Sequence, residues 1–569
     1  MQTPNHLVAA ATPATARAAG RGPRHTPRSA ALLSAAVLLI GPAATACGSD
    51  TDTDSGSGPA VAGGTLRYAV ETEPACIDPQ VSPLDVAALI DRNIFDSLVE
   101  LAPDGTIKPW LAERWEISDD RTAYTFHLRT GVTFHDGTVL DAAAVKATLD
   151  HAVDPKTKSQ YAVGLLGPYA GADVVDPSTV RVRLSRPYTP ILQALSTAYL
   201  GIQSPESLKR DNTEVCAAPV GSGPFSFAGW TKKQKIDLTR NDKYAWGPSS
   251  AKHSGAAYLD AISIQFIQED SVRIGSLTSG QLDAVGGISP SRVAALKSNG
   301  KLQYLKAEAP GGVYAVHLNS NRGPLADQRV RTALQRSVNL DQLVSTVYFG
   351  QYNRAWSPLS PTTLGYAKVL ENTWRYDPDL ANRLLDEAGW TAKDADGFRV
   401  KDGKRLTLSW PFGAQLLREQ RDVLAQGIAA DAKKVGIEVN REGLDTGSYT
   451  KRVMAADADL WDASTVRAEP DILRTLFESE QLPAKGGMNV LKVNDPQLDE
   501  WLRHAAGAPH GDARDAEYVQ VQKYVVDQAL VIPVYTPSYL LGAAKSLRGL
   551  SFEPTGYPLF YDVSKGKGA

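Results

Sequence analysis

Residue types that could carry out catalysis are present in the sequence, but they do not form a catalytic pattern. There is no Gly-x-Ser-x-Gly nucleophile elbow and no His-Glu-x-x-His metal motif. Carboxylates come in pairs, Asp119 with Asp120 and Asp457 with Asp459, but the spacing places neither pair across a cleft. The histidines beyond residue 46 lack the spacing of metal ligands: His127, His135, His151, His253, His317, His504 and His510. We therefore predict that the protein is not an enzyme and needs no metal or cofactor.

The composition is typical of a packed globular protein. The chain has 569 residues, of which 43% are hydrophobic and 22% charged, ordinary proportions for folded domains. This length corresponds to about three to four domain-sized units. The formal net charge is −3 and no basic stripe is visible, so we expect no nucleic acid among the partners.

The N-terminus is typical of an export signal. Residues 1–29 hold four arginines and no acidic residue, and an apolar run from Ala30 to Ile40 follows. We predict a signal peptide over residues 1–46. The segment 44–47 resembles a bacterial lipobox, although alanine stands at its first position, where a large aliphatic residue is usual. This resemblance predicts that Cys47 carries a lipid.

A lipid on Cys47 would anchor the protein to the outer face of the cell membrane. Residues 47–62 are rich in Gly, Ser and Asp, a composition that predicts a flexible tether. The alternative is ordinary cleavage near Ala46, in which case Cys47 has no role. Removal of residues 1–46 takes away four arginines, so the formal net charge of the mature chain becomes −7.

Two cysteines remain beyond the signal, and export permits disulfide bonds. Cys76 and Cys216 each lie in a loop with prolines nearby. A bridge between them is the simplest pairing, and two buried free thiols are the alternative. A bridge would close a loop of about 140 residues, worth about 4–5 kcal/mol in the chain-entropy model.

The hydrophobic pattern predicts a mixed α/β chain. Residues 64–70 alternate as a short strand, and residues 84–98 have one apolar helical face. Residues 124–129 and 132–134 both alternate and are joined by Thr130-Gly131, which predicts a β-hairpin.

Capping residues mark two further helices. Asp141 precedes a helix predicted over residues 142–152. Asp377 followed by Pro378 predicts the start of another helix, which Gly389 ends. Strands and helices that alternate in this way exclude an all-helical bundle.

Residues 111–149 contain the motif on which a family resemblance rests. The stretch has Trp115, Ser118-Asp119, Tyr-Thr-Phe-x-Leu-Arg at 124–129, Gly-Val-x-Phe-His-Asp-Gly at 131–137, and Ala142-x-x-Val145. It closely resembles the signature of the family 5 extracellular solute-binding proteins, the peptide-, nickel- and oligosaccharide-type receptors of ABC importers. It departs from that signature at Val139-Leu140, where the family usually has a proline.

Five further segments resemble landmarks of the same family and follow in the same order. They are Pro219–Phe225, Arg240–Tyr244, Tyr258–Asp283, Val330–Asp341 and Asp377–Trp390. Together with the signature they span about residues 63–540, nearly all of the mature chain.

The resemblance implies an α/β fold of the two-lobed, type II periplasmic-binding-protein kind. Two lobes joined by two hinge strands would close over a ligand like a flytrap. The first lobe would comprise residues 61–101, 217–309 and 526–569. A domain inserted in it would comprise residues 102–216, and the second lobe residues 310–525.

The resemblance also indicates where a ligand would be held. In peptide-binding members, an Asp of the second lobe lies about three residues before an acidic-Pro pair and binds the amino group of the peptide. Here the pair is Glu469-Pro470, and Val466 stands at the position of that Asp, followed by Arg467. Valine cannot pair with an ammonium group and Arg467 would repel one. Arg467 instead suits a carboxylate, phosphate or sulfonate, through bidentate hydrogen bonds.

Two alternatives to this assignment remain open. Arg467 could form a surface ion pair with Glu469 or Asp471. Asp462 could replace the missing anchor through a shift in register.

Aromatic residues supply the remaining candidates for ligand contact. Trp356 lies two residues after Arg354 in a segment that runs along the cleft in relatives, and Trp410 and Trp461 lie at strand ends. Tyr314 lies on the strand that enters the second lobe. Such rings can stack on sugars, peptide planes or aryl groups, and packing in the core is the alternative for each.

We therefore expect a lipid-anchored receptor that captures a peptide-like or other small organic solute and delivers it to an ABC permease and its ATPase. We expect it to act as a monomer. Two other classes are weighed against this one: an exported hydrolase, and a surface sensor or adhesin that has kept the flytrap fold but does not take part in transport.

Overall fold

The structure is a computed structural model and describes residues 60–485 and 487–566. The predicted signal peptide over residues 1–46, the lipidation site Cys47 and most of the predicted tether lie outside the described residues. In the described part of the chain, every helix is too short or too polar to span a lipid bilayer.

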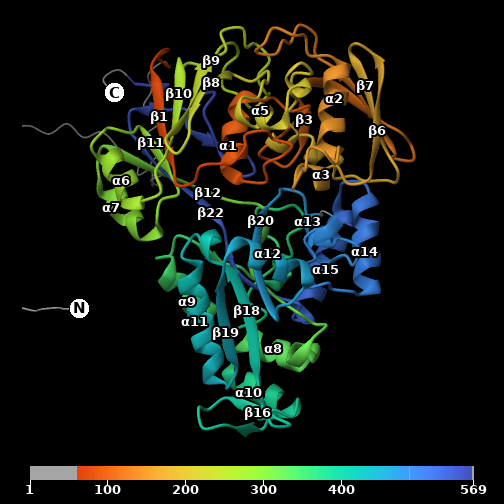
Figure 1. The fold of residues 1–569 in the computed structure, drawn as a ribbon, viewed down its shortest axis with the longest axis vertical. Helices are drawn as coiled ribbons and strands as arrows, with labels where there is room; N and C mark the ends of the chain where they lie inside the picture. Colours follow the sequence, from red (N-terminus) through yellow and green to blue (C-terminus); the bar gives the residue numbers. More distant parts are fainter. Residues whose placement is uncertain (1–59, 486, 567–569) are drawn as a thin grey trace, which may run out of the picture. The chain divides into compact units, whose positions relative to one another are not determined.

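The first lobe is built on a mixed sheet whose strands come from separate parts of the chain (Figure 1). Its strand order is β12-β22-β11-β1-β10-β9-β8. The central strand β1 pairs in parallel with β10 and β11, and the remaining pairs are antiparallel. The strands are β1 (Thr65–Val70), β8 (Phe225–Thr231), β9 (Lys235–Arg240), β10 (Ala261–Phe266), β11 (Ala284–Gly286), β12 (Leu302–Glu308) and β22 (Ser538–Ala544).

The inserted domain carries an antiparallel sheet of order β4-β5-β7-β6, with α2 (Ala142–Val153) packed against it. Its strands are β4 (Ala112–Ile117), β5 (Ala123–Leu128), β6 (Tyr169–Asp176) and β7 (Thr179–Leu184). Tyr124, Phe126 and Leu128 of β5 are buried and alternate with less buried residues, as expected of a strand with one face on the core. One continuous hydrophobic core joins this domain to the first lobe.

The hairpin predicted from residues 124–134 is wrong. β5 pairs with β4, which precedes it, and with β7, about 50 residues further on. Residues 132–134 form no strand, and their only ladder contact is an isolated bridge between Thr133 and Val139. The alternation of apolar and polar residues located the buried face of β5 correctly. Which strands pair with β5 depends on packing between distant parts of the chain.

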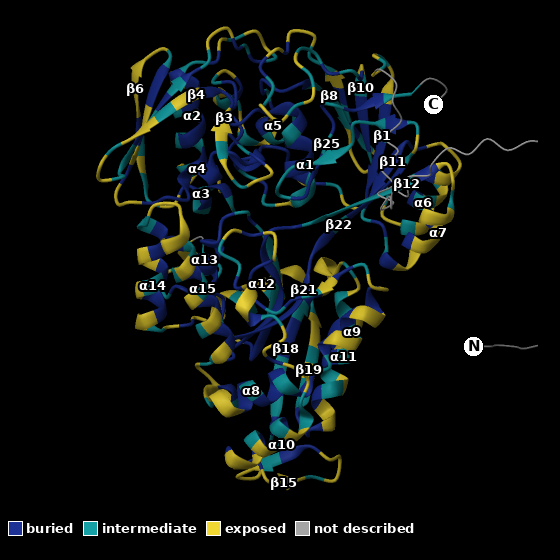
Figure 2. Ribbon diagram, turned by 180° about the vertical axis from the view of Figure 1, so that it is seen from behind, coloured by how far each residue is buried: buried dark blue, intermediate teal, exposed yellow. Residues whose placement is uncertain are grey.

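The second lobe has a central sheet of order β14-β21-β13-β20 and a parallel pair, β18 with β19. The strands are β13 (Gly311–Leu318), β14 (Asn353–Arg354), β18 (Thr407–Gly413), β19 (Glu438–Leu444), β20 (Leu460–Val466) and β21 (Val531–Thr536). Every residue of β13 is buried. Tyr314 and Val316 enter one hydrophobic core while Val313 and Ala315 enter another, so this strand is covered on both faces. β21, which pairs with it, is likewise buried along its whole length (Figure 2).

Two strand connections pass between the lobes. β12 of the first lobe ends at Glu308 and β13 of the second begins at Gly311, while β21 ends at Thr536 and β22 begins at Ser538. The two connections touch, because the Ala309 amide donates to the Pro537 carbonyl at 2.9 Å. They form the double hinge of a two-lobed binding protein.

One predicted domain boundary needs correction at this hinge. Residues 526–569 were expected in the first lobe, but β21 pairs with β13 and β14 in the sheet of the second lobe. All six residues of β21 are buried there, since an apolar strand gains most where both of its faces are covered. The crossing therefore lies at Pro537, and the other boundaries stay predictions.

The predicted caps form. The Asp141 side chain accepts from the Ala144 amide at the start of α2, and Asp377 accepts from the Leu380 amide at the start of α10 (Pro378–Glu387). The helix predicted over residues 84–98 is shorter, since α1 spans Asp85–Ile94. Just beyond its end lies Asp96, a buried side chain that accepts hydrogen bonds from the side chains of Ser222, Tyr244 and Trp246.

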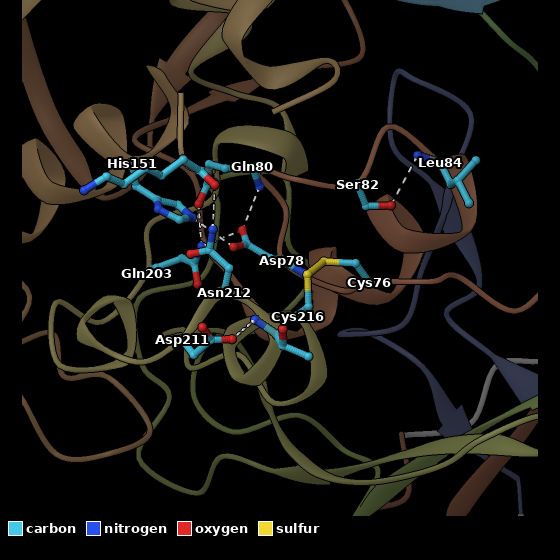
Figure 3. The surroundings of a disulfide bond; sticks show 12 residues. Cys76, Asp78, Gln80, Ser82, Leu84, His151, Gln203, Asp211, Asn212 and Cys216 are labelled. Atoms are coloured by element: carbon cyan, nitrogen blue, oxygen red, sulfur yellow. Dashed lines mark hydrogen bonds and ion pairs between the residues drawn. A yellow bond between two sulfur atoms is a disulfide. The ribbon is translucent and has the colours of Figure 1, made fainter. Parts of the chain in front are cut away.

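A disulfide joins Cys76 to Cys216, with 4.5 Å between their Cα atoms (Figure 3). Beside it lies a buried polar network centred on Asp78, which accepts from the Gln203 amide at 2.8 Å and pairs with His151 at 2.9 Å. The bond ties the segment that leads into α1 to α5 (Asn212–Ala217) of the inserted domain. The disulfide thereby links the first lobe covalently to its inserted domain.

Candidate ligand-binding site

Arg467 follows directly after β20, at the level of the double hinge. Its backbone amide donates to the Pro310 carbonyl at 3.2 Å. Gly311, with φ of +99°, lies so close that a Cβ on it would be 2.5 Å from the Arg467 nitrogen. Only glycine fits there, for reasons of both space and backbone conformation. The main chain of Arg467 is therefore fixed against the hinge.

The side chain of Arg467 reaches across to the inserted domain. It is 4% exposed. Its Nη1 donates to Thr475 Oγ1 at 3.1 Å, and its Nε donates to the Tyr161 hydroxyl at 3.4 Å. Tyr161 belongs to the inserted domain, and its hydroxyl in turn donates to the Val466 carbonyl at 3.2 Å. The two parts of the molecule thus meet at this guanidinium group.

No carboxylate of the described residues lies within ion-pairing distance of Arg467. The surface pair with Glu469 or Asp471 is therefore wrong for this structure. Glu469 pairs with Arg514, and Asp471 pairs with Arg474 at 2.9 Å. Burial lowers the pKa of Arg467, but the nearby Tyr161, Tyr188 and Asp471 raise it by more. Asp471 therefore acts on Arg467 through space, and no carboxylate forms a direct pair with this buried charge.

Arg467 lines a small cavity of about 20 Å³ between the lobes. Residues of three chain segments form its walls: Tyr161, Gln193, Thr197, Ala198 and Tyr199 of the inserted domain, Val466 and Arg467 of the second lobe, and Glu553, Thr555 and Tyr557 near the C-terminus. The Gln193 amide nitrogen is buried and has no acceptor within the described structure. Glu553 is already paired with Arg92 at 3.0 Å. The free polar groups at this cavity are therefore mainly hydrogen-bond donors.

Three predicted site residues meet each other but not this cavity. Asp462 accepts from Trp410 Nε1 at 2.6 Å and from the Tyr314 hydroxyl at 2.9 Å. Trp410 and Tyr314 are fully buried. Asp462 thus has two neutral donors on its two oxygens, and it braces β20 against β13 and β18.

The other predicted residues lie in the packing of the second lobe. Trp461 donates to the Tyr449 hydroxyl at 3.1 Å and is 9% exposed. The Arg354 guanidinium lies 3.6 Å from the centre of the Trp356 ring and pairs with Asp341 at 2.8 Å. None of the three predicted residues in this group lines the Arg467 cavity.

Further polar contacts between the lobes were missed by the sequence. Asp85 of α1 accepts from the Tyr557 hydroxyl at 2.9 Å and lies 3.5 Å from Arg418 of the second lobe. Arg418 is followed by Glu419. Burial raises the pKa of Glu419, but Arg421, Arg418 and a hydrogen bond from Tyr535 have the larger effect and lower it to about 2. No sequence motif marks these residues, because they come from distant segments and meet only in the fold.

Comparison with known proteins identifies the class. Residues 106–477 match the family model described as bacterial extracellular solute-binding proteins, family 5 middle. This match covers more than half of the chain, so the protein belongs to that family. In the part of the chain that the structure describes, no group of three or more His, Cys, Asp or Glu side chains could hold a metal ion.

Particular relatives extend over nearly the whole chain. Heme-binding protein A of Haemophilus influenzae is 28% identical over 83% of this chain and 87% of its own. The structure of NikA from Brucella suis with Fe(III)-EDTA has a TM-score of 0.78 and 27% identity, covering 88% of this chain and all of that one. The ABC transporter-associated protein DppA from Helicobacter pylori, in complex with the peptide STSA, has a TM-score of 0.75 and 26% identity over 89% of this chain and 99% of its own. The protein is accordingly a substrate-binding component of an ABC importer, with the two-lobed fold of that class.

Proposed function

We propose that the protein binds a small organic anion between its lobes, with Arg467 as the residue that holds the anionic group. The observation that carries the proposal is the buried guanidinium without a carboxylate partner. A bound carboxylate, phosphate or sulfonate would supply the missing charge through strong, charge-assisted hydrogen bonds. The unpaired Gln193 amide nitrogen would be a further donor to the same ligand.

The ligands of three relatives agree with this charge. The NikA structure holds Fe(III)-EDTA, a chelate of carboxylates, and a heme-binding protein is related over most of the chain. A peptide ligand such as that of DppA also ends in a carboxylate. The chemistry shared by these ligands is the anionic group rather than a common skeleton.

Binding between the lobes would shift the population toward the closed state. Tyr161 comes from the inserted domain and Arg467 from the second lobe, so a ligand that touches both stabilises their approach. The closed, loaded protein would then be recognised by the permease and its ATPase. Export through residues 1–46, a lipid on Cys47 and a monomeric state complete the proposal.

The proposal is tested by mass spectrometry of small molecules released on denaturation from purified residues 48–569. We expect an anionic compound. Titration of that compound should show binding about 10- to 100-fold weaker for Arg467→Ala, the value for losing a hydrogen bond to a charged group. Arg452→Ala is the matched control, because Arg452 pairs with Glu442 and Asp457 elsewhere in the second lobe. A ligand without any anionic group, or equal affinity in both variants, would refute the assignment.

The two other classes have cheap tests. An exported hydrolase would turn over generic ester, glycoside or peptide substrates, and we expect none to be cleaved. A surface sensor without transport would lack permease and ATPase genes beside its own, whereas a transport receptor is expected to have them.

A further inference from the structure

A second and larger cavity lies beside the Arg467 cavity, on the side of the first lobe. It has a volume of about 200 Å³. Its lining comes from residues 92–110, 196–197, 224–252 and 551–562, so every segment belongs to the first lobe or its insert. Residues 310–525 contribute nothing to it. Opening and closing of the lobes would therefore not move the walls of this cavity relative to one another.

The walls of this cavity are mainly rings and apolar side chains. Trp110 is 5% exposed, and its ring nitrogen already donates to the Trp246 carbonyl at 3.1 Å. The other rings of this surface are Tyr244, Phe552, Phe560 and Tyr561. A concave surface lined by rings is typical of a small-molecule site.

The carboxylates in the lining are already satisfied by the protein. Glu100 accepts from the Ser249 and Ser250 amides at 2.8 and 3.1 Å. Asp562 accepts from the Lys252 amide at 3.1 Å and pairs with His253 at 2.9 Å. No buried charge in this lining waits for a counter-ion, in contrast to the Arg467 cavity.

A polar wall separates the two cavities. Thr197, Glu553 and Thr555 line both of them. Within this wall Glu553 pairs with Arg92, with side chains 10% and 9% exposed. A negatively charged ligand would be attracted to Arg467 in the smaller cavity. The larger cavity offers aromatic rings and ion pairs whose partners already neutralise each other.

We propose that the larger cavity is a second binding site, for a neutral molecule that carries one or two aromatic rings. Such a ligand gains from leaving water and from stacking on Trp110, Phe552 and Tyr561. It needs no ion pair, because the buried Arg92 and Glu553 of the lining are already paired with each other. The site is independent of the anion site proposed at Arg467.

The first test measures binding of prodan, a neutral naphthalene fluorophore with two aromatic rings, whose emission shifts to shorter wavelengths in apolar surroundings. The wild-type protein is expected to bind it saturably. Ala251→Trp and Ser551→Phe each place a large side chain in the cavity from a different segment and should weaken binding roughly tenfold or more. The matched controls are Val272→Trp, an exposed position on α6 (Asp270–Thr278), and Arg467→Ala. Both should stay within about twofold of wild type.

The second test does not depend on a variant that folds. Benzophenone, also neutral, is photolysed with the wild-type protein, and the labelled peptides are mapped by mass spectrometry. We expect labels within residues 101–110, 244–252 or 551–562. Labels confined to residues 310–525, no saturable binding, or loss of binding in Arg467→Ala alone would overturn the proposal. Failure of the anion site leaves these expectations unchanged, so the two proposals fail separately.

Discussion

Arg467 and Arg474 lie seven residues apart, are both 4% exposed, and have opposite surroundings. Arg474 pairs with Asp471 at 2.9 Å and with Glu478 at 3.2 Å. Arg467 has only hydroxyl partners, on Thr475 and Tyr161. A buried arginine with its own carboxylates serves the fold, whereas one without them is left with a charge that a ligand can neutralise. We therefore propose two different roles for the same residue type at the same depth.

Removal of Arg474 should have the largest effect on stability. Arg474→Ala removes the partner of the buried carboxylates of Asp471 and Glu478. Breaking a buried ion pair in this way lowers the free energy of unfolding by about 3–5 kcal/mol. Urea denaturation measures it. Arg503→Ala is the control, because Arg503 reaches Glu478 at 3.7 Å from an exposed position and should cost no more than about 1 kcal/mol. Equal losses of unfolding free energy for Arg474→Ala and Arg503→Ala would contradict the structural role given to Arg474.

Removal of Arg467 should reverse the pattern. Arg467→Ala is expected to lower ligand affinity by about 1.5–3 kcal/mol and to leave the free energy of unfolding of the ligand-free protein within about 1 kcal/mol of wild type, because an unpaired buried charge is itself unfavourable. Isothermal titration and urea denaturation on the same samples measure both quantities. Arg467→Lys keeps the charge and should recover part of the affinity. A large loss of stability with unchanged affinity would make Arg467 a structural residue like Arg474.

Acid should reveal a third arginine pair, Arg421 with Glu419, at 2.8 Å. The pKa of Glu419 is lowered from 4.5 to about 2 in the folded protein, since Arg421 and Arg418 outweigh the effect of burial. Its contribution to stability is therefore present above pH 4.5 and is lost as the pH falls from there toward 2. Thermal melting between pH 6 and 2.5 should show a steeper decline for wild type than for Glu419→Gln. Parallel curves would contradict the assignment.

The smallest effect on binding is expected at Asp462. Because its oxygens accept from Trp410 and Tyr314, Asp462→Asn should leave ligand affinity within about twofold of wild type, at a cost in stability of about 1–3 kcal/mol for one misplaced donor. Titration of the co-purified ligand measures the affinity. A loss of tenfold or more would show that Asp462 anchors an amino group of the ligand, and Arg467 would lose its place as the main anchor.

Local features of the fold could be predicted from the sequence. The caps Asp141 and Asp377 form because a side-chain oxygen and the next helical amides are fixed by neighbouring residues. Partners of strands could not be predicted in the same way. β5 pairs with β4 and β7, and β21 joins the sheet of the second lobe, choices that depend on which faces find cover in the whole molecule.

The site shows the same division. Arg467 could be named because it lies in a recognisable segment after β20. Tyr161, Gln193 and Tyr557 could not, since they are about 90 to 310 residues away along the chain and only the fold brings them to the same cavity. For the aromatic candidates, ligand contact and core packing both stayed open, because strand periodicity does not say which face of a doubly covered sheet a ring will enter. Trp410 and Tyr314 entered the core.

The contact between Gly311 and the backbone of Arg467 has a consequence for the order of events in capture. Points near the axis of a rotation move little, while distant points sweep through wide arcs. Arg467 sits beside the pivot, so its position hardly changes between an open and a shut molecule. If Arg467 holds the anion as proposed, the anion would meet a cation that hardly moves. Contacts farther from the hinge would then form as the lobes close.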